Sequence, residues 1–352
     1  MTNSSHVAAI RPLAVTQGDP SGIGIEITLK AWGQRAPQTR PFYLLADAAQ
    51  VQRCANALGL DVPIAETTPQ TASAHFASSL PVVSLGVPVE GRPGMPNAAD
   101  AKATILSIER AVADVHAGHA HAVVTNPISK DVLYKSGFRH PGHTEFLGDL
   151  ATKHYGVAAR PVMLLWSPVL AVVPVTIHVA LKDVFSLLTG TLLKDTCRIV
   201  ARDMTERFGI SQPRLAVAGL NPHAGEAGSM GREELDIIAP ALADLRAEGL
   251  SVIGPLPADT LFHASARAKY DVAVCMYHDQ ALIPVKTLAF DSAVNVTLGL
   301  PFVRTSPDHG TAYDIAGQGI ADPASLVAAL DLAGRLSSVR QSADELLQAR
   351  QR

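Results

Sequence analysis

Short apolar runs of strand length alternate with longer amphipathic stretches along the chain. Residues 42–46, 81–85 and 121–125 are apolar runs bounded by turn-forming residues, a pattern that predicts buried strands. Between such runs, apolar residues recur every three or four positions, as at Ile108 and Val112, which predicts amphipathic helices. Because strands alternate with helices throughout, we expect an α/β fold with a largely parallel sheet.

Local capping signals predict several element boundaries. Asp47 directly follows a predicted strand, and we expect it to cap the next helix rather than to bind a ribose. The stretch 182–208 has a helical pattern that we expect to break near Gly190. Asp322 and Pro323 predict the start of a C-terminal helix that continues to residue 350.

The longest apolar stretch, residues 161–181, has the length of a membrane span but not its composition. Prolines interrupt it, and its two β-rich pieces flank Ser167 and Pro168. We therefore expect two buried strands, 162–166 and 170–177, rather than a transmembrane helix.

Composition narrows the possible partners. The 352-residue chain is 47% hydrophobic and 17% charged, and its formal net charge is −3. Without a basic stripe, neither nucleic acid nor an anionic membrane surface is expected as a partner. The cysteines, Cys54, Cys197 and Cys275, are widely spaced and odd in number, which argues against a disulfide framework. These features indicate a cytoplasmic protein that is long enough for two domains.

Two glycine-rich segments are candidates for binding a ligand through backbone N–H groups. The first, Gly18–Gly24, lies between a predicted strand and a helix, but its spacing matches neither the Rossmann nor the P-loop fingerprint. The second, residues 304–323, is a turn-rich segment with three glycines before the C-terminal helix. Within it, the side chains of His309 and Asp314 could contact a sugar or an adenine.

Three histidines, His178, His223 and His278, each follow an apolar strand. Taken singly, a histidine in this position is more often a hydrogen-bonded structural residue. Three in the same topological position favour a metal site, and three neutral imidazoles with an open position suit a catalytic Zn²⁺. The histidine group at 116–121 lies at the end of a predicted helix, where solvated side chains are the simpler interpretation.

Lys286, Asn295 and Arg304 are expected at strand ends around one edge of the sheet. Lysine and arginine together suit a phosphate, because they offer a point charge and a planar fork of donors. Ordinary surface charge is the alternative, but these residues flank apolar runs, where an unpaired charge would be costly.

Five segments together resemble the 4-hydroxythreonine-4-phosphate dehydrogenase family of vitamin B6 biosynthesis. In chain order they are Pro141–Phe146, Gly219–Glu226, Gly254–Phe262, Met276–Gln280 and Asn295–Thr305. The segment 304–323 also resembles the cofactor loop of the β-decarboxylating isocitrate and isopropylmalate dehydrogenases. One departure is Ile25, where the family commonly has proline.

The resemblance implies a three-layer α/β/α fold of the isocitrate and isopropylmalate dehydrogenase type, with two domains around a cleft. We expect residues 1–135 with 290–352 to form the cofactor-side domain. Residues 136–289 would form the domain for metal, substrate and dimerisation. The resemblance further implies a homodimer whose active site lies at the subunit interface and includes the partner subunit's His278.

Roles at matching positions follow from the same resemblance. One divalent ion, Zn²⁺ ahead of Mg²⁺ or Co²⁺, would be bound by His178, His223 and His278. The phosphorylated substrate would be contacted by His143, Thr144, Lys286, Asn295 and Arg304. The cofactor NAD(P)⁺ would be bound by His309, Gly310, Thr311, Ala312 and Asp314. The candidate catalytic residues are His223, Asp259 and Lys286, with Asp279 as the alternative to Asp259 for orienting an imidazole or moving a proton.

The implied reaction is the oxidation of 4-phosphooxy-L-threonine at C3 by NAD(P)⁺, with metal assistance, followed by decarboxylation to 3-amino-2-oxopropyl phosphate in pyridoxal 5′-phosphate biosynthesis. A paralogue that oxidises phosphoerythronate or phosphothreonate, or a diol dehydrogenase, is the alternative within the family. A phosphate acyltransferase or a phosphometabolite-binding protein is the alternative of another class. The three histidines and the segment 309–312 speak against the acyltransferase.

Overall fold

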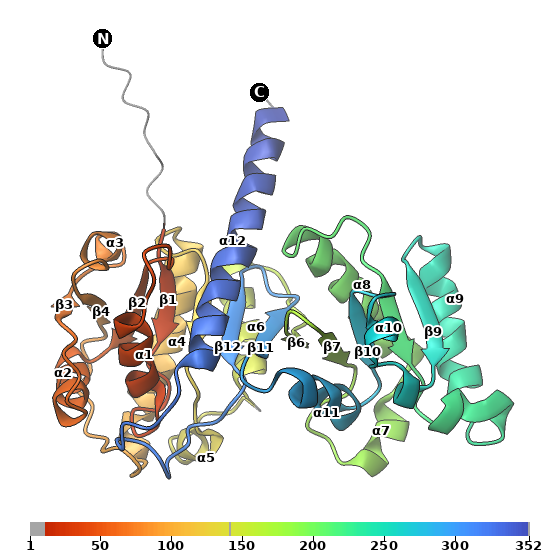
Figure 1. Cartoon of the computed structure of the whole chain (residues 1–352), viewed down its shortest axis with the longest axis horizontal. Coiled ribbons are helices and arrows are strands. Elements are labelled where there is room, and N and C mark those ends of the chain that lie inside the picture. Colours follow the sequence, from red (N-terminus) through yellow and green to blue (C-terminus); the bar gives the residue numbers. More distant parts are fainter. Residues whose placement is uncertain (1–10, 141, 351–352) are drawn as a thin grey trace. The chain divides into compact units, whose positions relative to one another are not determined.

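The computed structural model describes residues 11–140 and 142–350, of which 340–350 are described as backbone only. Contacts along the chain divide it into two compact units (Figure 1). Unit 1 contains the residues up to Ala159 together with Leu300–Ser337, and unit 2 contains Arg160–Gly299 and the residues from Ser338 onward. The sequence-based division had its boundaries after residues 135 and 289.

Unit 1 is built on a parallel sheet with the strand order β3-β4-β2-β1-β5-β12. The strands are β1 (Leu13–Thr16), β2 (Phe42–Ala46), β3 (Ile64–Glu66), β4 (Leu80–Ser84), β5 (Val123–Thr125) and β12 (Arg304–Pro307). The helices are α1 (Gly24–Gly33), α2 (Ala48–Ala57), α3 (Ala72–His75), η1 (Ala98–Asp100), α4 (Ala101–His116), α5 (Lys130–Lys135), α6 (His143–Tyr155) and α12 (Ala324–Arg350), whose residues up to Ser337 belong to this unit.

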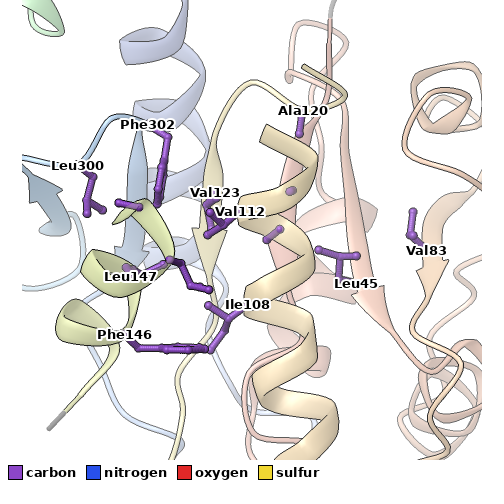
Figure 2. Close-up of a cluster of buried hydrophobic side chains, with 14 of the residues drawn as sticks. Leu45, Val83, Ile108, Val112, Ala120, Val123, Phe146, Leu147, Leu300 and Phe302 are labelled. Atoms are coloured by element: carbon purple, nitrogen blue, oxygen red, sulfur yellow. The ribbon is translucent and has the colours of Figure 1, made fainter. Parts of the chain in front are cut away.

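The core of unit 1 lies between its sheet and the neighbouring helices α4 and α6. Ile108 and Val112 of α4, Leu147 of α6 and Val123 of β5 are buried in one cluster with Phe302 (Figure 2). The spacing of Ile108 and Val112, one helical turn, explains why both face this core. The amphipathic pattern in the sequence therefore predicted the buried face of α4 correctly.

Unit 2 has the strand order β11-β6-β7-β10-β8-β9. Its strands are β6 (Val162–Trp166), β7 (Ala171–Pro174), β8 (Leu215–Ala218), β9 (Val252–Leu256), β10 (Val272–Cys275) and β11 (Val294–Leu298). Strand β6 runs antiparallel to β7 and β11, and the pairs among β7, β10, β8 and β9 are parallel. The helices are α7 (Leu181–Leu187), α8 (Gly190–Glu206), η2 (Pro222–Gly228), η3 (Glu234–Ile238), α9 (Ala239–Ala247), η4 (Ala258–Thr260), α10 (Ala264–Arg267) and α11 (His278–Ala289).

These elements confirm the α/β fold and several predicted boundaries. The apolar stretch 161–181 contains β6 and β7, and within the described part of the chain no helix is long and apolar enough to cross a membrane. The Asp47 carboxylate accepts a hydrogen bond from the backbone N of Ala49 at 3.1 Å, as a helix cap does. Asp322 does the same for the N of Ala324 at 2.9 Å, at the start of α12.

Two predicted local structures were wrong. Lys286 does not lie at a strand end but within α11, where Leu282 and Val285 are buried at helical spacing. The segment 304–323 is not a loop throughout, because its first four residues form strand β12. Consequently Arg304 is the first residue of a strand, and Asn295 lies near the beginning of β11.

Candidate functional site

The three candidate metal ligands follow three neighbouring strands of unit 2. The strand order is β7-β10-β8, and all three run parallel, with Pro174 opposite Cys275 and Val274 opposite Val217. Parallel strands end at the same edge of a sheet, so the segments that carry His178, His278 and His223 all leave from that edge. The topological position predicted for the histidines is therefore confirmed.

His178 and His278 lie side by side, with 5.7 Å between their ring centroids. The segment after β7 is attached to the end of β10, because the N and Oγ1 of Thr176 both donate to the carbonyl of Met276, at 3.2 and 2.8 Å. Nδ1 of His278 lies 2.8 Å from a carboxylate oxygen of Asp279. If Nδ1 carries the proton of that hydrogen bond, Nε2 keeps its lone pair for a metal or a substrate.

Two of the three histidines have a left-handed backbone, which is uncommon for any residue except glycine. The φ angles of His178 and His223 are 52° and 51°. In the turn η2, Ala224, Glu226 and Ala227 also have positive φ. Such conformations cost about 1–3 kcal/mol each and cluster at functional sites. Two of the three candidate metal ligands therefore lie in segments with a strained backbone.

A buried carboxylate, Glu234, fixes the chain that leads into η2. It accepts hydrogen bonds from the backbone N of Leu220 and of Asn221, both at 2.7 Å, and from the Asn221 side chain at 3.0 Å. A β-carbon added at Gly225 would lie 2.5 Å from Oε2 of Glu234, which is too close, so glycine is required at this position. Sequence reasoning missed Glu234, because nothing in the local pattern separates it from the neighbouring Glu233.

Gln280 connects the strand ends that carry His223 and His278. Its Nε2 donates to the carbonyl of Gly219 at 2.8 Å, and its Oε1 accepts from the N of Met276 at 2.7 Å. The amide side chain therefore holds the ends of β8 and β10 at a fixed separation. Its place in the segment Met276–Gln280 was visible in the sequence, but its function as a bridge was not.

The imidazole side chains suit a divalent cation of intermediate softness. Imidazole nitrogens are ordinary ligands of Zn²⁺ and Co²⁺. Among the described residues, no group of three His, Cys, Asp or Glu side chains lies close enough together to hold a metal ion. His178 and His278 form the pair that the chain itself brings together.

The other histidine group, at the end of α4, is held by separate partners. The ring of His116 packs edge-on against that of Tyr155, with 4.6 Å between the ring centroids. Nε2 of His119 lies 3.0 Å from Nε2 of the Gln70 amide. His121 is half-buried against the Arg40 guanidinium, and burial followed by that charge lowers its pKa to about 4. The expectation of solvated side chains was therefore wrong for His121.

In unit 1, a positively charged group surrounds the start of helix α6. Arg304 is 4% exposed and donates to Oγ1 of Thr125 from Nε at 3.1 Å and from Nη2 at 2.6 Å. His143, the first residue of α6, has a buried Nε2 without a hydrogen-bond partner in the described structure. Burial, together with the charges of Arg304 and Lys130, holds the pKa of His143 well below its usual range, so its ring is neutral at pH 7.

Lys130 reaches the same helix start. Its Nζ atom lies next to Gly142, the N-cap of α6, because a β-carbon added at Gly142 would be only 3.4 Å from that atom. Thr144 is half-buried in the first turn, and Pro141 lies outside the described residues. The positive end of a helix dipole, an ammonium and a guanidinium together suit an anion. Lys130 was not among the predicted site residues, although it closes the polar cluster directly after β5.

The two glycine-rich segments, treated separately in the sequence, form one structure. The backbone N of Ile23 donates to the carbonyl of Thr311 at 3.1 Å, and a side chain at Gly22 would meet that oxygen at 2.9 Å. Only glycine permits this close approach. Further along, Glu26 of α1 accepts from the N of Gly317 at 3.2 Å and of Ala321 at 3.1 Å. Helix α1 therefore positions the segment from Thr311 to Ala321.

Within the predicted cofactor-binding residues, polar groups are available to a ligand. The carboxylate of Asp314 and the backbone of Gly310 are exposed, and Ala312 has a φ of 46°. Nε2 of His309 is buried and lacks a hydrogen-bond partner in the described structure. An exposed carboxylate can accept hydrogen bonds from the hydroxyl groups of a ribose.

The remaining predicted residues belong to unit 2. Asp259 is exposed on the turn η4, which lies against η2, the turn that carries His223. Lys286 and Asn295 are half-buried, in α11 and β11 respectively.

Comparison with known proteins identifies the family. The model of the pyridoxal phosphate biosynthetic protein PdxA matches residues 37–333. The chain belongs to the PdxA family. It is 59% identical to the 4-hydroxythreonine-4-phosphate dehydrogenase of Bradyrhizobium diazoefficiens over 341 residues, which cover 94% of this chain and 99% of that protein.

Solved structures of PdxA relatives share the fold. The 4-hydroxythreonine-4-phosphate dehydrogenase of Klebsiella pneumoniae is 36% identical, with a TM-score of 0.82 over 93% of this chain and 99% of that one. A terephthalate 1,2-cis-dihydrodiol dehydrogenase from Burkholderia xenovorans is 30% identical, with a TM-score of 0.62 over 92% and 98%. The PdxA family member described here is a dehydrogenase.

Replacing Glu234 by Ala is expected to loosen the chain before His223. The backbone N–H groups of Leu220 and Asn221 would lose their buried acceptor, at about 1–3 kcal/mol for each. Hydrogen exchange followed by mass spectrometry should show faster exchange in residues 219–228. Asp236→Ala, an exposed carboxylate in the same turn, is the control. Unchanged exchange in Glu234→Ala would contradict this positioning function.

His143 is expected to make the protein sensitive to acid. Its folded-state pKa lies below the unfolded value of about 6.5, so the unfolded chain binds an extra proton as the pH falls through that value, and stability falls. In urea unfolding, the free energy of unfolding should fall more steeply below about pH 6.5 for the wild type than for His143→Asn. The two slopes should differ by up to about 1.4 kcal/mol per pH unit. The exposed His116→Asn should follow the wild type. Parallel curves for wild type and His143→Asn would show that His143 is protonated equally in both states.

Proposed function

We propose that the protein oxidises 4-phosphooxy-L-threonine at C3 with NAD(P)⁺ and that the product loses CO₂ to give 3-amino-2-oxopropyl phosphate. The observation that carries the proposal is the 59% identity, over nearly the full length of both chains, to a relative named 4-hydroxythreonine-4-phosphate dehydrogenase. The groups found in both units supply the chemistry that this reaction needs.

The substrate phosphate is assigned to the start of α6. Arg304 and Lys130 supply positive charge there, and His143 and Thr144 are the first residues of the helix. Because the His143 ring is neutral, it can donate one hydrogen bond without adding a second buried charge beside Arg304. Positive charge and helix N–H groups together suit the phosphate of the proposed substrate.

The cofactor is assigned to residues 309–314. NAD(P)⁺, when bound, accepts the hydride from the substrate carbon. His309 and Asp314 offer polar groups to its sugar and phosphate parts, and Gly310, Thr311 and Ala312 form the backbone surface between them. Hydrogen bonds from Ile23 to Thr311 and from Gly317 to Glu26 attach this surface to the start of α1.

A divalent metal ion is assigned to His178, His223 and the partner subunit's His278. The left-handed backbone at His178 and His223 supports a functional constraint on both residues. Zn²⁺ suits the nitrogen ligands best, with Co²⁺ or Mg²⁺ as alternatives. The ion would supply a Lewis acid for the alcohol and the ketone.

Exposed apolar side chains support a homodimer that uses unit 2. Leu181 and Phe185 on α7 are 61% and 51% exposed, and Ile283 on α11 is 65% exposed. Helix α7 follows His178 directly, and α11 begins at His278. Apolar surface on these helices is the kind that subunit contacts cover, and it would bring a second copy of each histidine to the same region.

The two candidate carboxylates differ in what they contact. Asp279 holds Nδ1 of His278 and is therefore assigned to orienting that ring. Asp259, exposed on η4 beside the turn that carries His223, is the candidate for moving the proton of the alcohol. Lys286 and Asn295 are assigned to the polar part of the substrate.

Turnover with defined substrates tests the reaction. The purified protein should reduce NAD(P)⁺ with 4-phosphooxy-L-threonine and much less with 4-phosphoerythronate, as measured by nicotinamide absorbance. Lys130→Met should raise KM about 10- to 100-fold through the loss of a charge-assisted phosphate contact. Lys135→Met, which removes an exposed lysine paired with Asp131, is the matched control. Faster turnover of the sugar acid would move the assignment to a paralogous dehydrogenase.

Replacing His223 by Ala tests the metal. The variant should keep its fold, as seen by circular dichroism, and lose bound metal and activity together, because one of three ligands is gone. His119→Ala, outside this group, should retain both. Full activity in His223→Ala would remove the metal site from the mechanism.

A further inference from the structure

A cavity of about 480 Å³ in unit 1 lies apart from the residues assigned to substrate and cofactor. Its walls come from helix α2, the start of α1 and residues 89–93, and Gly317 closes one side. Pro20, Ile25, Val89 and Pro93 give it an apolar lining. The size falls within the ~300–1,000 Å³ that small-molecule sites occupy.

One buried polar atom in this lining has no partner within the described structure. Gln50 is 5% exposed, and its Nε2 donates to the carbonyl of Pro20 at 3.1 Å. Its other amide atom, Oε1, is buried and accepts no hydrogen bond. A buried acceptor without a donor costs about 1–3 kcal/mol. A ligand that fits the cavity and offers an N–H or O–H group would remove that cost.

Positive charge lies beside the apolar lining. Arg53 and Arg92 both line the cavity. The Arg53 side chain is 60% exposed and donates from Nη2 to the carbonyl of Val89 at 3.1 Å, and a guanidinium has five donors in all. Two acidic residues line the cavity as well, Glu26 and Glu90. Glu26 already pairs with Lys30 at 2.9 Å and accepts from two backbone N–H groups. Arg53 also pairs with Asp47 at 3.8 Å, outside the lining, so the exposed Glu90 is the acidic group to set against the two arginines. The cavity therefore favours an anionic group at its arginines.

We propose that this cavity binds a small heteroaromatic ring that carries an amino or hydroxyl donor and an anionic group. The ring would lie against the prolines and Ile25, its donor would bind Oε1 of Gln50, and its phosphate or carboxylate would contact Arg53 and Arg92. An adenine nucleotide has this chemistry. It could be one half of the dinucleotide cofactor or a separate effector.

The position of the cavity connects it to the segment assigned to the cofactor. Glu26 and Gly317 both line it, and Glu26 accepts the hydrogen bond from the N of Gly317. A ligand seated there would contact the groups that hold the segment Thr311–Ala321 on α1. In this respect alone, the inference rests on the proposed function.

Adenosine 5′-monophosphate is the probe. Calorimetry on the full-length protein should detect its binding, with weaker binding of adenosine, which lacks the anion, and of ribose 5-phosphate, which lacks the ring. Ala57→Trp, at an exposed position that lines the cavity, should weaken binding at least about tenfold by filling the space. Gln50→Leu should weaken it as well. Ala49→Trp, exposed on the same helix but not part of the lining, should bind like the wild type.

Cys54 offers a second readout, because it lines the cavity and is half-buried, whereas Cys197 and Cys275 are buried. Burial, followed by the charge of Glu26, raises the pKa of the Cys54 thiol to about 11, so alkylation is best followed at about pH 9. Bound adenosine 5′-monophosphate should slow that alkylation. The proposal is overturned if Ala57→Trp and Gln50→Leu bind the nucleotide as tightly as the wild type and Cys54 is not protected.

Competition identifies the source of the ligand. Displacement of adenosine 5′-monophosphate by NAD⁺ would assign the cavity to the adenine half of the cofactor, and simultaneous binding would assign it to a separate effector. Both outcomes support the site. Loss of nucleotide binding in Ala57→Trp together with absent turnover of 4-phosphooxy-L-threonine in the wild type would uphold the cavity and reject the proposed reaction. Turnover without any nucleotide binding to the cavity would uphold the proposed reaction and reject the cavity as a binding site.

Discussion

The parallel pairing of β7, β10 and β8 is the constraint on which the candidate metal site depends. His178, His223 and His278 are 45 and 55 positions apart in the sequence. They follow the same edge of the sheet only because these strands are neighbours and end together. Hydrogen bonds across the strand ends then set the finer geometry. Thr176 and Gln280 both bind the backbone of Met276, and Gln280 also binds Gly219.

Parallel pairing also positions the buried arginine of unit 1. Strands β5 and β12 pair in parallel, with Arg304 opposite Val123, and the Arg304 guanidinium binds Thr125 at the end of β5. A buried arginine requires polar partners, and Thr125 is one of them. Burial lowers the pKa of His143, and the nearby charges of Arg304 and Lys130 lower it further, so the ring beside the buried guanidinium is neutral. The family assignment and this local electrostatics agree on a phosphorylated substrate.

The sequence alone predicted the alternation of strands and helices, the caps at Asp47 and Asp322, and the position of three histidines after three strands. These features depend on local patterns of one or two turns, which a single sequence contains. It did not predict that Lys286 lies in a helix, because the short apolar run before it fits either period. Nor did it predict Glu234 and Gln280, whose partners are backbone groups of other segments. Tertiary hydrogen bonds to the backbone leave no pattern in one sequence.

The left-handed backbone at His178 and His223 has a consequence for how this protein tolerates change. Glycine adopts that conformation without strain, so glycine at either position would relax the chain while deleting an imidazole. A search for more thermostable variants would thus favour substitutions that remove two of the three candidate metal ligands. Stabilising substitutions are therefore better sought in other parts of the chain.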